Sequence, residues 1–555
     1  MNAKIWYDIK EIKNIKWIVL ITSVVAVITY GFFLTHASIG LDDTGIERYF
    51  IEGWAPYVGR WVLFLLNYVF DFAHFTPWFM DAIGVLLLCI ASLLFCLLWY
   101  RISEKQVKTL SLVAFCLIFI THPLLGEVYI YYLHNGISFA FVLLALTGLC
   151  WWEYLSRPQY IQLIWMTVFV SLAIGCYESF ALVYIVLICA IYICAVSKGC
   201  LAKRTAKSWI KDITLSVAVL MGSMVIRTIM YKIINAALGM EENARDMSAI
   251  KLWFVNNPLI ILKDIAYQFL LRYILNAEYI FGIKVFILTV CAFVLTIVVI
   301  AIKKKQYKLL LWGTVMLSAP WLLAVLEMTI SSYRASQALM LLIAFAWFYV
   351  FEALQQVNWK KGYRFIQISL VSILLIVSFR QGFELHQYFY RDYVKSEYDR
   401  EYCRMLANEL ITEYDTSKPV IFVGQREMPK AFREYAYLEP DTQEYYDIAS
   451  KFNLQYTKAF QKYVHPDYGY GLYEVATSDV VAWMTWADLG DGEYEIYSYM
   501  EMLGYEFVQP AKEVRAEIVA LASGDTEYPM WPAKGSIVET EEYICVYLGP
   551  VTVNL

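Results

Sequence analysis

The stretch WIVLITSVVAVITYGFFLTHAS, residues 17–38, is an apolar run that contains no Asp, Glu, Lys or Arg. A helix needs about 20 such residues to cross the hydrocarbon core of a bilayer. Other runs that approach or reach this length occur at 81–100, 109–125, 136–153, 161–177, 180–197, 212–230, 281–302, 309–327, 336–357 and 365–379. We therefore predict a mainly α, polytopic membrane helical bundle with about 11 spans.

The composition of the whole chain agrees with this fold class. Of the 555 residues, 60% are hydrophobic and 17% are aromatic, and the mean hydropathy is +0.52. A soluble protein is usually about 45–50% apolar, so a purely soluble class is excluded and the lipid bilayer is the expected surrounding. The basic runs at 203–204 and 303–305 are interpreted as determinants of topology, and no nucleic-acid partner is expected.

Lysine and arginine are distributed unequally between the loops. If residue 1 is cytoplasmic, the inner segments hold 20 Lys/Arg in 58 residues and the outer segments hold 8 in 118. Positive charge is retained on the cytoplasmic side, so we expect a cytoplasmic N-terminus in the plasma membrane. The odd number of spans then places the C-terminal region outside. Segments near 57–75 and 259–281 are interpreted as amphipathic helices on the outer surface.

The C-terminal region differs in charge from the rest of the chain. Residues 391–555 hold 29 Asp/Glu and 14 Lys/Arg, a net charge of −15, whereas the first 390 residues carry +10 within the total of −5. We therefore divide the chain into a transmembrane domain, 1–385, and an acidic extracytoplasmic α/β domain, 386–555. Its pattern predicts helices at 397–414 and 511–523, a helix and then a strand within 492–510, and strands at 417–425 and 541–549.

No phosphate-binding glycine loop, metal-spaced Cys/His set or nucleophile elbow is recognised in this acidic domain. It is interpreted as a domain for recognition or for support of a membrane site. Whether Cys403 and Cys545 form a disulfide is left open by the sequence.

Ionisable residues gather at the span ends that are predicted to face outward. They are Asp42, Asp43, Glu127, His134, Glu178, Arg227, Glu327 and Arg334. Ionisable groups near lipid are costly and are candidates for function. A carboxylate can accept the proton of an attacking hydroxyl, and arginines can neutralise a departing phosphate through bidentate hydrogen bonds. The combination suits transfer of a group from a lipid-linked phosphate.

The first outer loop carries an acidic pair, an arginine and a W…GRW element. Its residues are Asp42, Asp43, Arg48, Trp54, Gly59, Arg60 and Trp61. With the preceding span and the surface helix, this loop resembles the GT-C superfamily of integral-membrane glycosyltransferases. Within that superfamily it is similar to the bacterial Gtr-type glucosyltransferases that modify surface polysaccharide. GCYES at 175–179 resembles a Tyr-Gln element of the family, with Glu178 in place of Gln, and SSYRAS at 331–336 resembles its late Arg element.

The resemblance covers roughly residues 1–400 and implies a function. The donor would be a polyprenyl-phosphate-linked hexose, usually glucose, and the acceptor an outward-facing surface glycan or teichoic-type polymer. Transfer would invert the sugar, with Asp42 or Asp43 as the base. The donor phosphate would meet Arg60, Arg227 and Arg334, and the other substrate-binding residues would be Glu178, Arg48, His134 and Glu127. No cofactor is indicated by the sequence, which leaves dependence on a divalent metal open.

Each of these residues also has a structural alternative. Asp42 or Asp43 could cap a helix, Arg60 could extend along the interface, and Arg227 could pair with an outer acid. Glu178 could form a buried hydrogen bond, and structural roles are the more common ones for residues such as His134 and Glu127.

Three other functions remain open on the sequence alone. A transporter or flippase of lipid-linked glycan is disfavoured because no internal repeat is found and the charges lie at one edge. A polymerase or ligase of polyprenyl-linked glycan uses similar chemistry. A non-catalytic scaffold would not need so many spans.

Overall fold

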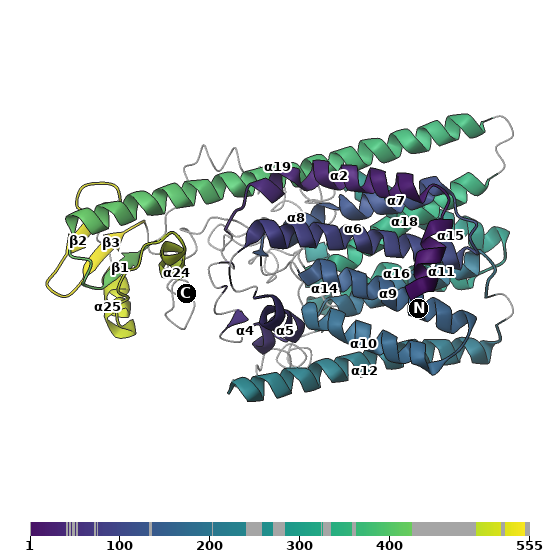
Figure 1. Cartoon of the computed structure of the whole chain (residues 1–555), viewed down its shortest axis with the longest axis horizontal. Coiled ribbons are helices and arrows are strands. Elements are labelled where there is room, and N and C mark those ends of the chain that lie inside the picture. Colours follow the sequence, from purple (N-terminus) through teal and green to yellow (C-terminus); the bar gives the residue numbers. More distant parts are fainter. Residues whose placement is uncertain are drawn as a thin grey trace.

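The computed structural model describes most of the membrane region and part of the C-terminal region (Figure 1). The described residues are 2–39, 43, 46, 50–51, 54–71, 74, 76–132, 136–201, 204–239, 258–269, 283–322, 325, 335–357, 362–424, 495–522 and 528–549.

The described part is a bundle of apolar helices, which confirms the mainly α polytopic class. Nine of its helices are long and apolar enough to cross a membrane. They are α2 (Ile15–Thr35), α6 (Pro77–Ile102), the run of α7 (Thr109–Ile120), η2 (Pro123–Leu125) and α8 (Gly126–Tyr129), α9 (Gly136–Ser156), α11 (Phe180–Ser197), α12 (Ala206–Leu238), α15 (Ile283–Lys303), α18 (Gln337–Gln356) and α19 (Tyr363–Glu413).

The two remaining predicted spans also fall on helices, but on shorter ones. They are α10 (Tyr160–Cys176), with 17 residues, and α16 (Lys308–Ser318), with 11. The apolar pattern therefore located the helices correctly, while the number of helices with full spanning length in the described chain is nine rather than eleven.

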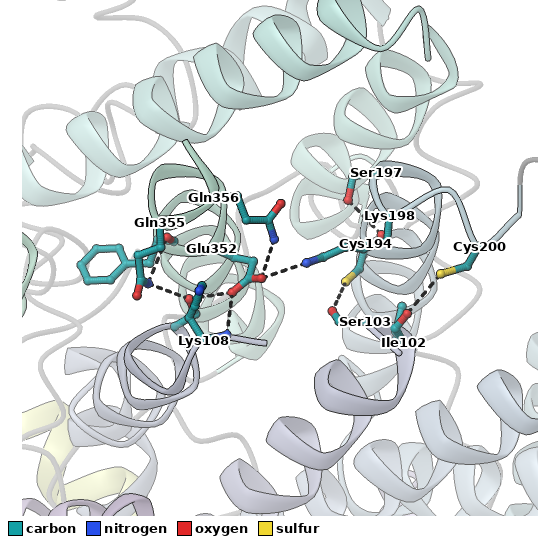
Figure 2. A network of polar contacts seen from close by, with 12 residues as sticks. Ile102, Ser103, Lys108, Cys194, Ser197, Lys198, Cys200, Glu352, Gln355 and Gln356 are labelled. Atoms are coloured by element: carbon teal, nitrogen blue, oxygen red, sulfur yellow. Dashed lines mark hydrogen bonds and ion pairs between the residues drawn. The ribbon is translucent and has the colours of Figure 1, made fainter. Parts of the chain in front are cut away.

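The segments that were predicted to be cytoplasmic meet at one end of the bundle, which we call the predicted inner end. Arg101 pairs with Asp8 of α1 (Asn2–Glu11), with Nε 2.8 Å from Oδ2. Glu352 of α18 accepts hydrogen bonds from Lys198 Nζ at 2.8 Å and from the backbone N–H of Lys108 at 3.1 Å (Figure 2). These contacts join loops that the alternation of spans places on the same side.

The two predicted surface helices correspond to short elements at the opposite end, which we call the predicted outer end. The segment 57–75 contains α5 (Trp61–Phe70), which follows α4 (Trp54–Tyr57), and 259–281 contains α14 (Pro258–Phe269). The ring of Phe269 packs against Trp321 of η5 (Ala319–Trp321) at 4.5 Å. Phe269, the last residue of α14, therefore lies beside η5, which follows α16. Residues 270–281 lie outside the described part.

Helix α19 joins the bundle to the C-terminal region. It has 51 residues, which at about 1.5 Å per residue gives a length of about 75 Å. This is more than twice the roughly 30 Å hydrocarbon core of a bilayer. In Figure 1 the helix runs beside α2 and continues beyond the bundle to the sheet. The domain boundary that we placed at 385/386 therefore lies within one continuous helix.

The C-terminal region contains a three-stranded sheet of order β1-β3-β2. β1 (Val420–Val423) is parallel to β3 (Ile544–Tyr547), and β2 (Ile537–Glu539) is antiparallel to β3. Helices α24 (Glu495–Met502) and α25 (Lys512–Ala522) accompany it. The end of α19 packs with this sheet in a second hydrophobic core.

Most elements predicted for this region are present, with one error. The strand expected after α24 is wrong, because residues 505–510 form no strand. The carbonyl of Val508 does accept a hydrogen bond from the N–H of Val420 at 3.0 Å. One such contact does not make a ladder. The third strand of the sheet is instead β2, which pairs with β3 and was not predicted. Cys403 and Cys545 are both buried and free.

Candidate functional site

Arg60, from the W…GRW element, lies beside Tyr177 and Glu178 of the GCYES element. It precedes α5, and its guanidinium lies 4.3 Å from the centre of the Tyr177 ring. Its Nε is 3.8 Å from Oε2 of Glu178. The Glu178 side chain is 40% exposed, whereas that of Arg60 is 15% exposed, so the pair is screened by solvent and adds little to stability. Its effect is to orient the guanidinium.

Arg227 reaches the same corner from α12. Gly59 has a φ of +88°, a backbone conformation that glycine adopts without steric cost. A Cβ atom at position 59 would lie 2.1 Å from Nη2 of Arg227, so the guanidinium occupies the space that any other residue would fill. Residue 59, in the turn before Arg60, therefore has to be glycine, both because of its positive φ and because Arg227 occupies the space of a side chain. We call Gly59, Arg60, Tyr177, Glu178 and Arg227 the arginine corner.

A second glycine brings α10 against α5. A Cβ atom on Gly175 would stand 2.6 Å from Nε1 of Trp61 and 2.6 Å from Cγ2 of Val62. Trp61 and Val62 are both buried. This close approach places the end of α10, which carries Tyr177 and Glu178, directly beside the start of α5.

Asp43 is buried, with 1% of its surface exposed. It lies within electrostatic range of Tyr132, whose pKa is raised by burial and, to a smaller extent, by the carboxylates of Asp81 and Asp43. The Tyr132 hydroxyl donates a hydrogen bond to the carbonyl of His74 at 3.3 Å. Two carboxylates thus lie within electrostatic range of one phenol.

Asp81 was not selected from the sequence. It lies in the second turn of α6 and is 4% exposed. The available signal was an acidic residue at the start of an apolar run, since such residues near lipid require a specific environment.

Glu127 faces a different neighbour. Its Oε1 accepts a hydrogen bond from the hydroxyl of Tyr388 on α19 at 2.8 Å. The preceding residue, Gly126, lets the Tyr388 ring approach, because a Cβ there would be 3.0 Å from its Cδ1 atom. A hydrogen bond of this kind agrees with a structural role for Glu127, which was the alternative left open by the sequence.

Five of the residues selected from the sequence, namely Asp42, Arg48, His134, Glu327 and Arg334, lie outside the described residues. Within the described ranges, no group of three or more His, Cys, Asp or Glu side chains is arranged to hold a metal ion. The described site thus consists of the arginine corner and of the buried Asp43 near Asp81 and Tyr132. It offers two guanidinium groups for an anion and an acid that could accept a proton.

Comparison with known proteins gives one match. The family model described as glucosyl transferase GtrII matches residues 31–379. The match is longer than half of the chain, and it includes the end of α2, the first loop, the arginine corner and every later helix through the membrane part of α19. No curated protein and no solved structure matches the chain.

Proposed function

Because the chain belongs to the GtrII glucosyltransferase family, as the resemblance to Gtr-type enzymes predicted, we propose that it transfers glucose from a polyprenyl-phosphate-linked donor to a surface acceptor. The acceptor is a cell-surface glycan or a teichoic-type polymer on the outer face of the plasma membrane. In this proposal the N-terminus is cytoplasmic and the acidic domain, 386–555, is extracytoplasmic. Transfer inverts the sugar.

The arginine corner carries this proposal. Arg60 and Arg227 come from separate helices and meet around Gly59. A guanidinium presents a planar set of donors that matches phosphate. Tyr177 and Glu178 hold Arg60 before any substrate arrives, and such preorganisation lowers the cost of binding. We assign the donor phosphate to Arg60 and Arg227, together with Arg334.

The acidic pair supplies the base. The acceptor hydroxyl oxygen attacks the anomeric carbon while Asp42 or Asp43 takes its proton. The bond between the anomeric carbon and the phosphate oxygen breaks, and the polyprenyl phosphate leaves with the electron pair, stabilised by the arginines. The burial of Asp43 supports this role, since exclusion of water strengthens the electrostatic interactions between a carboxylate and a bound substrate. Glu178, Arg48, His134 and Glu127 are proposed to contact the substrates.

An apolar groove beside α2 supports a lipid-linked donor. It lies between α2 and α19, has a volume of about 370 Å³ and is lined by residues such as Val25, Ile28, Leu375 and Phe379. Phe379 and Ile28 are largely exposed on the side of the bundle that faces lipid. An isoprenoid chain in this groove would bring its phosphate toward the loop that follows α2.

The experiment uses the full chain in lipid nanodiscs with polyprenyl-phosphate glucose and isolated surface glycan. Mass analysis should show the addition of one hexose by the wild type. Asp42→Asn or Asp43→Asn, whichever removes the base, should lower the rate by about 10²- to 10⁴-fold, while Asp415→Asn in the acidic domain should leave it unchanged. Full activity in both single variants and in the double variant would reject the assignment of the base. Transfer from a nucleotide sugar alone would reject the lipid-linked donor.

A further inference from the structure

The segment between α2 and the acidic pair is attached to α19. The hydroxyl of Ser38 donates a hydrogen bond to the Asp392 carboxylate. The backbone N–H of Ile39 donates to the hydroxyl of Ser396 at 3.1 Å. Asp392 and Ser396 are one helical turn apart on α19 and are almost completely buried. Two successive residues of the loop are therefore bound to one face of a helix.

The side chain of Ile39 continues this attachment into the C-terminal region. Ile39 is 7% exposed and belongs to the same hydrophobic core as Tyr402, Cys403 and Leu406 of α19. That core also contains residues of β1 and β3, such as Val420 and Ile544. A residue of the first loop thus completes the core of the acidic domain.

Aromatic contacts fix how far along α19 this segment lies. Phe33 of α2 stacks on Phe389 with ring centres 4.6 Å apart, and the His36 ring meets Tyr393 at 4.9 Å. From the first contact to the second, the residue number rises on both segments, so residues 33–39 and α19 run in the same direction. Because α19 is one continuous helix, the register of 33–39 against it is set at several successive positions.

Asp43 follows Ile39 by four residues, and four extended residues span at most about 14 Å. The position of the acidic pair is therefore restricted by the attachment of Ser38 and Ile39. We propose that α19 and the core of the acidic domain are a positioning element of the transfer reaction, and that Ser38, Ile39, Asp392 and Ser396 place the acidic pair. This inference rests on the proposed function, in which that pair supplies the base.

The role predicts a particular kinetic effect. A displacement of about 1 Å in a reacting group can lower a rate by roughly 10²-fold. The donor phosphate is assigned to Arg334 and to the arginine corner, which is built by the start of α5, the residues that follow α10, and α12. The donor lipid is assigned to the groove, whose lining residues on α19 end at His386 and do not include Asp392 or Ser396. Loosening the attachment should therefore lower kcat while the KM for the donor stays nearly constant.

The test compares matched substitutions in the full chain in nanodiscs. Ile39→Ala and Ser396→Ala should each lower kcat by about tenfold or more, with a change in donor KM of less than about twofold. Ile411→Ala, at an exposed position of α19, and Ser417→Ala, in the acidic domain, should leave both constants unchanged. Ile39→Leu should restore most of the lost kcat, because an apolar side chain of the same volume again fills the core.

The outcomes separate this inference from the proposed function. An unchanged kcat in folded Ile39→Ala and Ser396→Ala, with an active wild type, would overturn the positioning role alone. A rise in donor KM equal to the fall in kcat/KM would also overturn it. If Ile39→Ala does not fold, Ile39→Val and Ser396→Ala decide the question. A wild type that transfers no glucose would overturn the proposed function, and this inference with it.

Discussion

The guanidinium of Arg227 lies directly against Gly59, where a Cβ atom would come within 2.1 Å of Nη2. These residues are far apart in the sequence, and their contact brings α12 to the turn that begins α5. The position of Arg227 thus depends on the absence of a side chain at residue 59. This dependence can be tested separately from the charge of the arginine.

We expect Gly59→Ala to impair transfer strongly. The new methyl group displaces the Arg227 guanidinium, and alanine is strained at a φ of +88°. The donor KM should rise by about tenfold or more, because one charge-assisted hydrogen bond contributes about 1.5–3 kcal/mol. Steady-state kinetics with varied donor measure this effect.

Gly199→Ala is the matched control for Gly59→Ala. Gly199 has a φ of +79°, and its Cβ would meet nothing within 4 Å. It therefore carries the same backbone strain without a displaced arginine. A donor KM that rises equally in both variants would contradict the role of Arg227 and would attribute the effect to strain.

Arg60→Lys should weaken donor binding although the positive charge remains. Lysine has no planar fork for bidentate hydrogen bonds and makes a less extensive contact with the Tyr177 ring. We expect the donor KM to rise by about tenfold or more, on the same scale of about 1.5–3 kcal/mol. Arg157→Lys, at an exposed position, serves as the control. Equal affinity of the Arg60 variant and the wild type for the donor would exclude phosphate binding at this residue.

Glu352 should be important for stability rather than for chemistry. Its two carboxylate oxygens accept hydrogen bonds from Lys198, Gln356, Ser111 and the backbone of Lys108 (Figure 2). Breaking a buried ion pair costs roughly 3–5 kcal/mol. We therefore expect Glu352→Ala to lower the free energy of unfolding by about 3 kcal/mol, because Lys198 retains some access to solvent.

The control for Glu352→Ala is Glu104→Ala, at an exposed position of the same end of the bundle. Thermal unfolding in nanodiscs should separate the two variants, while the transfer rate of the folded protein should remain normal in both. Identical melting temperatures would show that the hydrogen bonds around Glu352 do not stabilise the bundle.

The sequence predicted the helices of the bundle well, because each apolar run records contact with lipid or with a packed interior. The continuity of α19 was not predicted. Its composition changes near residue 380 from apolar to charged, and we placed a domain boundary there. The change reflects a different surrounding, whereas the backbone hydrogen bonds of a helix continue across it. Hydropathy reports the surroundings of a segment and not the continuity of its backbone hydrogen bonds.

The site was predicted in part. The GRW and GCYES elements were selected separately, and the structure brings Arg60 onto Tyr177 and Glu178. Periodicity cannot reveal such a contact, because it depends on the close packing of Gly175 against Trp61. The hydrogen bond between Ile39 and Ser396 is equally invisible, since it joins residues on opposite sides of the predicted domain boundary.

The stability of the acidic domain should fall between pH 9 and pH 11, partly because of Cys545. Burial raises the pKa of this thiol from 9.0 to about 11. The unfolded chain therefore loses the proton at a lower pH than the folded chain does, and the stabilisation present below pH 9 is lost as the pH rises toward 11. A shift of two pH units corresponds to about 2.7 kcal/mol.

Urea titrations of the full chain, followed by circular dichroism, measure the free energy of unfolding at each pH. This free energy should depend less on pH in Cys545→Ala than in the wild type or in Cys291→Ala, whose cysteine is exposed. Parallel pH dependences in all three proteins would contradict the contribution of Cys545.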